Sequence, residues 1–120
     1  MALGGAKPVV LVVDDEPSIR LLCRVNLELG GYQVLEADTL GAAREHLEGG
    51  VDVVLLDMHI GKERGDGLLD ELKERGIPVA VVTGSTDVAQ VSKVADAVLP
   101  KPFTIDELEA AVARLSGRSR

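Results

Sequence analysis

Short apolar runs alternate along the chain with segments whose apolar residues recur at helical spacing. Most of the runs are nearly continuous in Val, Leu, Ile and Ala, a composition typical of strands buried on both faces of a parallel sheet. The expected strands are Val9 to Val13, Tyr32 to Ala37, Val51 to Leu56, Val79 to Val82 and Ala97 to Leu99.

The intervening segments carry signals for the start and the end of helices. Proline suits a first helical turn, glycine commonly ends a helix, and Thr followed three residues later by Glu forms a capping box. These signals are Pro17 with Gly30-Gly31, Thr39 with Gly49-Gly50, Leu68 to Leu72 with Gly76, and Thr104 with Glu107. We expect a short, weak helix at Asp87 to Ala95 and a polar, Gly-rich loop from His59 to Asp66.

Five β/α units in 120 residues predict an α/β fold whose parallel sheet is covered by helices on both faces. Right-handed crossovers leave few topologies, and we expect a doubly wound, flavodoxin-like sheet of order 2-1-3-4-5. Residues 1–120 are expected to form a single domain with a core at about 7–116. In such sheets the functional site lies beyond the carboxyl ends of the strands.

Composition narrows the class of protein. The net charge of -7 argues against direct binding of nucleic acid, which requires a basic surface. The single cysteine, Cys23, excludes an intramolecular disulfide, and the beginning, Met1 to Pro8, lacks the apolar region of a signal peptide. No apolar run approaches the roughly 18 residues of a membrane span, so a cytoplasmic location without membrane insertion is expected.

Polar side chains fall where the expected strands end. Asp14, Asp15 and Glu16 follow the first strand, Asp57 follows the third, Thr83 follows the fourth, and Lys101 lies just past the fifth. Clustered carboxylates repel one another unless a cation compensates, and Mg²⁺ prefers oxygen ligands. An aspartate beside such an ion can attack a phosphoryl group and form an acyl phosphate. The ion, a hydroxyl and an ammonium would hold the phosphoryl oxygens.

Four segments carry a resemblance to a known family. In their order and spacing, VVDDEPSIR, VDVVLLD, VVTG and LPKPF resemble the response-regulator receiver domains of bacterial two-component signalling, from about Val9 to Leu115. The resemblance implies a phosphorylation-dependent switch rather than an enzyme acting on other molecules. It also implies a histidine kinase or phosphotransfer protein as phosphoryl donor and a downstream protein as target.

The resemblance also assigns residues to the metal site. It implies that Asp15 is a direct ligand of Mg²⁺ and that Asp14 helps to hold the ion through water. Asp57 and the backbone carbonyl of His59 would complete the ligands from the protein.

For the phosphoryl group, the resemblance implies that Asp57 accepts it and that Lys101 contacts it and links to Asp57. Thr83 would move to bond it, which would transmit its arrival to a surface formed by the fourth helix, the fifth strand and the fifth helix. The Lys101-Pro102 bond is expected to be cis.

The sequence departs from the usual receiver pattern near these residues. Val98 stands where receivers usually carry an aromatic residue that rotates with the Thr, and Gly84 stands where Ala is more common. The loop after Asp57, MHIGKERGDG, lacks the usual Met-Pro and is longer than usual, whereas the segment from Thr83 to Lys101 is shorter. PVAVVTG resembles a single-domain subgroup with the pattern Pro-Phe-x-Phe-Ala-Thr-Gly, which works with HWE-type kinases. Here Val79, Val81 and Val82 replace the Phe, Phe and Ala of that pattern.

Other interpretations stay open at this point. The chain could act as a phosphate sink or shuttle in a phosphorelay. An aspartyl-phosphate hydrolase of the haloacid-dehalogenase type is a second class, although such enzymes place Asp-x-Asp after the first strand. A flavin-binding flavodoxin-like module is a third, although Asp14-Asp15 would repel its phosphate. Taken singly, Asp14 or Asp15 could cap a helix.

Overall fold

The five expected strands form one parallel sheet. The computed structural model describes residues 7–84 and 93–117, and the sheet has the order β2-β1-β3-β6-β7. Its strands are β1 (Val9–Val13), β2 (Gln33–Ala37), β3 (Val53–Asp57), β6 (Val79–Thr83) and β7 (Ala97–Pro100). In chain order of these five strands this is 2-1-3-4-5, so the predicted topology is confirmed.

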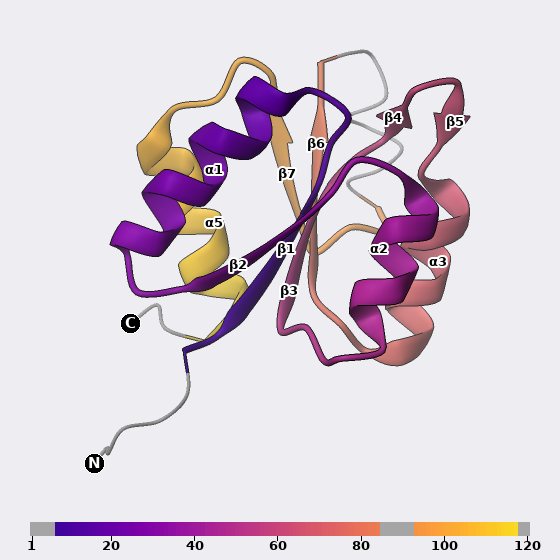
Figure 1. Ribbon diagram of the computed structural model, residues 1–120, viewed down its shortest axis with the longest axis horizontal. Coiled ribbons are helices and arrows are strands. Elements are labelled where there is room, and N and C mark those ends of the chain that lie inside the picture. Colours follow the sequence, from indigo (N-terminus) through magenta and orange to yellow (C-terminus); the bar gives the residue numbers. More distant parts are fainter. Residues whose placement is uncertain (1–6, 85–92, 118–120) are drawn as a thin grey trace.

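Helices cover both faces of the sheet, as Figure 1 shows. They are α1 (Pro17–Leu29), α2 (Leu40–Leu47), α3 (Asp66–Arg75) and α5 (Ile105–Leu115). Helices α1 and α5 lie on one face and bury Cys23, Leu27 and Leu108 against it, whereas α2 and α3 lie on the other and bury Leu47 and Leu72. Two aliphatic cores on opposite sides of one sheet define the doubly wound architecture.

Two predicted helix starts are confirmed in atomic detail. The Thr39 hydroxyl accepts a hydrogen bond from the Ala42 amide, and Thr104 with Glu107 forms the reciprocal capping box. The start of α1 does not match the alternative in which Asp14 or Asp15 caps the helix. Its N-cap is Glu16, which makes no side-chain cap bond. Capping by Asp14 or Asp15 is therefore wrong, which leaves both carboxylates for other partners.

The loop expected between His59 and Asp66 is instead a small antiparallel hairpin. Strands β4 (His59–Ile60) and β5 (Glu63–Arg64) pair with each other through a two-residue connection. Gly61 begins that connection with φ of +60°, and no described non-glycine residue, Lys62 included, has a positive φ. These signs fit a type II′ turn, which places glycine first and matches the twist of paired strands.

Apolar spacing alone also misjudged part of α1. The positions at helical spacing that predict its buried stripe are Ile19, Leu22, Cys23, Asn26 and Leu29. Leu22 and Leu29 are exposed, whereas Leu27, outside that stripe, is fully buried beside Cys23. The helix expected at Asp87 to Ala95 falls mostly on residues 85–92, which lie outside the described residues. Within residues 7–84 and 93–117, no helix combines the length and apolar character needed to cross a bilayer.

Candidate phosphorylation and metal site

Strand register brings two acidic residues to the same edge of the sheet. Val13 of β1 lies opposite Leu56 of β3, so the following residues, Asp14 and Asp57, leave the sheet side by side. On its other side, Asp57 lies opposite Val82, the last residue before Thr83. This edge is the upper end of the sheet in Figure 1.

Asp14 and Asp57 use the same local device to hold their carboxylates. The Oδ1 atom of Asp14 accepts a hydrogen bond from the amide of Glu16 at 2.9 Å, and Oδ1 of Asp57 accepts one from the amide of His59 at 3.0 Å. Aspartate commonly closes such a turn with the amide two residues on. Asp14 is 2% exposed and Asp57 is 6% exposed, so each carboxylate is buried but keeps its Oδ2 for another partner.

The ammonium group of Lys101 faces both of these Oδ2 atoms. Its Nζ lies 3.4 Å from Asp57 Oδ2, 3.7 Å from Asp14 Oδ2 and 3.6 Å from Glu16 Oε1. The Lys101-Pro102 bond is cis, as predicted, and the Lys101 amide donates to the Thr83 carbonyl at 2.8 Å. Lys101 is therefore held next to the acids by its own backbone.

Asp15 completes a group of three acids that can hold a metal ion. Its side chain is exposed, and Oδ2 accepts a hydrogen bond from the amide of Gly61, at the turn of the hairpin, at 2.8 Å. One carboxylate oxygen each from Asp14, Asp15 and Asp57 lie within 4.8 Å of one another. Such an all-oxygen set suits a hard divalent cation.

Burial and charge shift the pKa values of two groups at the site. Burial raises the pKa of the Asp14 carboxyl above its ordinary value, although the Glu16 amide and the Lys101 ammonium oppose the change. Burial alone would lower the pKa of Lys101, but the carboxylates of Asp14, Asp57 and Glu16 together outweigh it and raise that pKa. The charged form of Lys101 is therefore favoured, whereas burial makes the charged form of Asp14 less favourable than that of a carboxyl group in water.

The remaining predicted residues lie at or near this edge. Thr83 ends β6 and is 1% exposed, and Val98 is half-buried in β7, where it packs with the α2/α3 side of the core. His59 lies at the start of the hairpin, with its ring nitrogen Nε2 3.5 Å from Arg64 Nη1. The roles assigned to Thr83, Val98 and the His59 carbonyl stay predictions.

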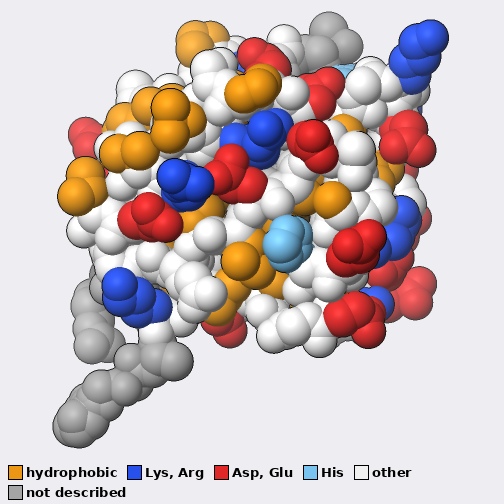
Figure 2. All heavy atoms as spheres, viewed as in Figure 1, with side chains coloured by type: hydrophobic (Ala, Val, Ile, Leu, Met, Phe, Trp, Pro, Cys, Tyr) orange, Lys and Arg blue, Asp and Glu red, His pale blue; other side chains and the backbone are white. Residues whose placement is uncertain are grey.

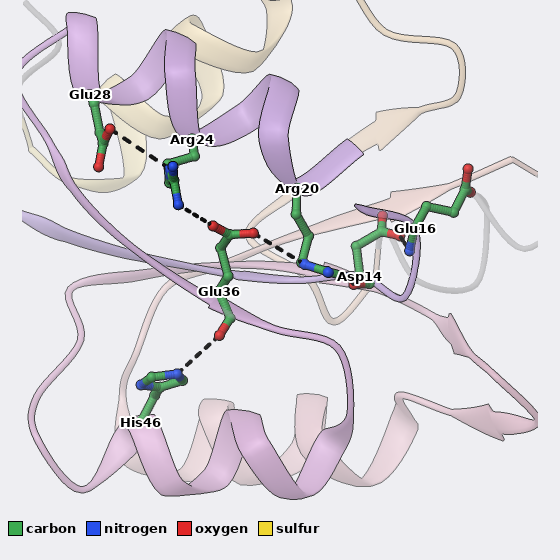
Figure 3. Close-up of polar contacts among 7 residues, drawn as sticks. All are labelled: Asp14, Glu16, Arg20, Arg24, Glu28, Glu36 and His46. Atoms are coloured by element: carbon green, nitrogen blue, oxygen red, sulfur yellow. Dashed lines mark hydrogen bonds and ion pairs between the residues drawn. The ribbon is translucent and has the colours of Figure 1, made fainter. Parts of the chain in front are cut away.

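Arg20 contacts the site and Glu36 contacts Arg20, although the sequence did not single out either residue. Arg20 of α1 donates from Nη1 to the Asp14 carbonyl oxygen at 2.7 Å and from Nε to Glu36 Oε1 at 3.2 Å. Figure 3 shows Glu36 of β2 lying between Arg20 and Arg24. Arg20 stands inside VVDDEPSIR at i+4 from Glu16, but only the crossover to β2 brings Glu36 to it.

Gly65 lies close to the backbone of the site at Asp57 and Met58. Its amide donates to the Met58 carbonyl at 2.9 Å, and a Cβ there would lie 3.3 Å from the backbone oxygen of Asp57. Together with Gly61, it lets the longer loop turn back tightly under the acidic strand end. Two glycines were the sequence signal for this loop. Gly61 is the first residue of a two-residue turn, and Gly65 directly precedes α3.

With this geometry established, comparisons with known proteins show the family. Residues 10–113 match the response regulator receiver domain family. The chain belongs to this family and is the receiver domain of a two-component response regulator.

The curated relatives are longer proteins. The chain is 42% identical over 118 residues to the transcriptional regulatory protein KdpE of Mycobacterium tuberculosis, covering 88% of this chain and 51% of that protein. It is 37% identical over 111 residues to the KDP operon transcriptional regulatory protein KdpE of Escherichia coli, covering 84% and 48%. The chain thus spans about half the length of these relatives, which are named as regulators rather than as enzymes.

Solved structures show the same fold. A CheY-like response regulator receiver domain protein from Methanospirillum hungatei superposes with a TM-score of 0.80 at 29% identity, over 93% of this chain and 96% of that chain. The receiver domain of NtrX from Brucella abortus gives a TM-score of 0.81 at 28% identity, over 92% and 99%. These similarities support a receiver rather than a flavin-binding module or a haloacid-dehalogenase hydrolase.

Proposed function

We propose that this domain is switched by a phosphoryl group transferred from a histidine kinase or phosphotransfer protein to Asp57. The observation that carries the proposal is the position of Lys101 Nζ, 3.4 Å from Asp57 Oδ2 at the edge where three acids converge. A carboxylate next to a fixed ammonium group, near a cation site, has the surroundings that phosphoryl transfer needs.

The residues present fit a bound Mg²⁺. Among the described side chains, Lys101 supplies one positive charge within 4 Å of the carboxylates of Asp14, Glu16 and Asp57, so negative charge is in excess. Asp14, Asp15 and Asp57 would hold the ion, with the His59 carbonyl as a further ligand. Bound there, Mg²⁺ supplies positive charge that stabilises the transferring phosphoryl oxygens.

In the proposed reaction, a carboxylate oxygen of Asp57 attacks phosphorus and the bond from phosphorus to the donor breaks. With a phosphohistidine donor the leaving group is the imidazole, and the product is an acyl phosphate on Asp57. Lys101 holds one phosphoryl oxygen, and the Thr83 hydroxyl turns to bond another. The added charge, up to about two negative units, biases the surface formed by β7 and α5.

The surface next to the site favours a protein partner. Exposed apolar side chains gather on α1, which begins directly after the acidic loop, as Figure 2 shows. They are Leu21, Leu22, Val25 and Leu29. A groove of about 460 Å³ links this helix to the site and is lined by Leu22, Lys101 and Phe103, among others. We propose this region as the contact for the phosphoryl donor, because the groove is lined by Lys101, whose ammonium group contacts Asp57.

Incubation with acetyl phosphate and Mg²⁺ tests the proposal directly. We expect the intact mass to rise by one phosphoryl group in the wild type and to stay unchanged in Asp57→Asn. Asp70→Asn is the matched control, because Asp70 is an exposed acid on α3, and it should be phosphorylated like the wild type. An unchanged wild-type mass, or a mass increase in Asp57→Asn, would contradict the assignment.

Two further measurements separate a switch from a hydrolase and from a phosphate sink. A hydrolase would release phosphate continuously from a generic phosphate ester, whereas a receiver forms one acyl phosphate for each chain. A phosphate sink would be phosphorylated at Asp57 without a change in the β7/α5 surface, which amide chemical shifts at Val98 and along α5 would reveal.

A further inference from the structure

We propose that Arg20 is a positioning residue that orients the acid pair Asp14-Asp15 for cation binding by holding the peptide group between them. The inference rests on the proposed cation site. It concerns a residue that contacts neither the phosphoryl acceptor nor the ammonium of Lys101 in the contacts described above.

Arg20 joins two elements through one guanidinium group. Its Nη1 donates to the Asp14 carbonyl at 2.7 Å while its Nε donates to Glu36 of β2 at 3.2 Å. The side chain is 16% exposed, so both bonds are partly shielded from water. Because the guanidinium is planar and rigid, fixing one nitrogen on Glu36 fixes the direction in which the other points.

The carbonyl of Asp14 matters because the peptide group is planar. The Asp14 carbonyl shares one plane with the amide and the Cα atom of Asp15, so a donor that fixes the carbonyl also fixes the position of the Cα atom that carries the Asp15 side chain. The Asp14 amide, for its part, donates to the Ala37 carbonyl of β2 at 3.0 Å. Both polar backbone groups of Asp14 are thus tied to β2, one directly and one through Arg20 and Glu36.

Arg24 offers a close comparison on the same helix. It lies one turn further along α1 and contacts the other oxygen of Glu36, with Nη1 2.9 Å from Oε2, and also Glu28 at 3.9 Å. Its side chain is 46% exposed. Figure 3 shows Arg20 extending toward Asp14, whereas Arg24 lies between Glu28 and Glu36. The two arginines share a carboxylate partner, but Arg20 adds the bond to the acidic loop.

Positioning and simple charge predict opposite signs for the loss of Arg20. Removing a positive charge near a cation site strengthens cation binding if Coulomb energy alone decides. If Arg20 instead orients the acids, its removal weakens binding. Loss of an outer partner that orients metal ligands commonly costs about 10-fold in affinity or more.

The test is a titration with Mg²⁺ alone, followed by the amide shifts of Asp15 and Gly61 in the wild type, Arg20→Met and Arg24→Met. We expect Arg20→Met to raise the dissociation constant about 10-fold and Arg24→Met to leave it within about 2-fold, since surface ion pairs contribute little. In chelator, Arg20→Met and Arg24→Met should lower the midpoint temperature of thermal unfolding by similar, small amounts. Arg20→Lys keeps the charge but not the two-pronged geometry, so it should bind Mg²⁺ as weakly as Arg20→Met.

Each outcome decides a separate point. Binding by Arg20→Met that equals or exceeds the wild type would overturn the inference and leave the proposed function standing. Full rescue by Arg20→Lys would show that a single donor replaces Arg20, so that the two-pronged link through Glu36 does not orient the acids, and would also overturn the inference. Absence of Mg²⁺ binding in the wild type would overturn the cation site itself, and with it both proposals. If Arg20→Met does not fold, Arg20→Lys against Arg24→Lys makes the same comparison.

Discussion

Asp14 and Asp57 lie at the carboxyl ends of neighbouring strands and their carboxylates are held alike, yet the elements around them differ. Each accepts a hydrogen bond on Oδ1 from the amide two residues on, and each turns Oδ2 toward Lys101. Asp14 is followed directly by α1, whose Arg20 holds its carbonyl. Asp57 is followed by the β4/β5 hairpin, with Gly65 close against its backbone oxygen.

The difference fits the different roles that we propose for these two similar acids. The backbone of Asp14 is held at both polar groups and its side chain is 3% exposed, so it suits holding a cation in place. The side chain of Asp57 is 8% exposed and lies nearer to the ammonium, which suits attack on an incoming phosphorus. Local geometry makes the acids equivalent, and the elements that follow them make them unequal.

The largest expected effect separates the two acids by chemistry. Asp57→Asn removes the nucleophile, so phosphorylation by acetyl phosphate should be lost completely. Asp14→Asn removes one cation ligand, and the rate should fall about 10-fold or more without vanishing. Mass spectrometry over a time course in Mg²⁺ measures both. Equal residual rates in the two variants would mean that the acids are not divided as we propose.

The second effect concerns the Lys101 ammonium group, which contacts both acids. Lys101→Met leaves the two buried carboxylates without the ammonium, and we expect the free energy of unfolding at neutral pH in chelator to fall by about 2 kcal/mol. Urea unfolding measures this change. The control is Lys73→Met, whose ion pair with Asp96 is exposed and whose loss should cost less than about 1 kcal/mol. A Lys101→Met variant as stable as the control would show that the acids need no internal cation.

The third effect is a pH dependence that belongs to Asp14. Burial raises the pKa of this carboxyl in the folded state above its ordinary 3.8, so the folded state binds the proton more tightly than the unfolded state. The contribution of Asp14 to the free energy of unfolding therefore falls as pH rises from near 3.8 through the folded pKa. In chelator, the stability advantage of Asp14→Asn over the wild type should grow over that range and then level off. If the free energies of unfolding of the two proteins changed with pH in parallel, charging Asp14 in the folded state would carry no cost, which would contradict the prediction.

The smallest effect tests the support under Asp57. In Gly65→Ala a new Cβ meets the Asp57 backbone oxygen at 3.3 Å and a Leu56 methyl at 3.3 Å, and stability should fall by about 1 kcal/mol. Gly84→Ala is the matched control, because its Cβ would meet the Lys101 Cβ at an ordinary 3.6 Å and should change stability by less than about 0.5 kcal/mol. Thermal melts measure both. The reverse order would indicate that the Lys101 side of the site is the tighter one.

The sequence predicted most of the frame that carries these residues. Apolar runs placed the five strands to within two residues at their starts, and the Thr104 capping box and the cis Lys101-Pro102 bond were found as expected. The hairpin at Gly61 was missed because two-residue strands carry almost no periodic signal. The burial of α1 was partly misjudged because helical spacing does not say which side of a stripe meets the sheet, as the exposed Leu29 shows.

By itself the sequence determined the alternation of strands and helices, and therefore that the acids, Thr83 and Lys101 follow strands of one parallel sheet. Periodicity and turn residues act over a few positions, so they are visible in one segment at a time. The family resemblance already implied the link between Lys101 and Asp57. Only the tertiary structure decided the other contacts across segments: Glu36 with Arg20, Gly61 with Asp15, and Lys101 with Asp14. Those contacts depend on strand register and on the crossover of α1, which bring together residues that are distant in the chain and carry no mutual pattern within it.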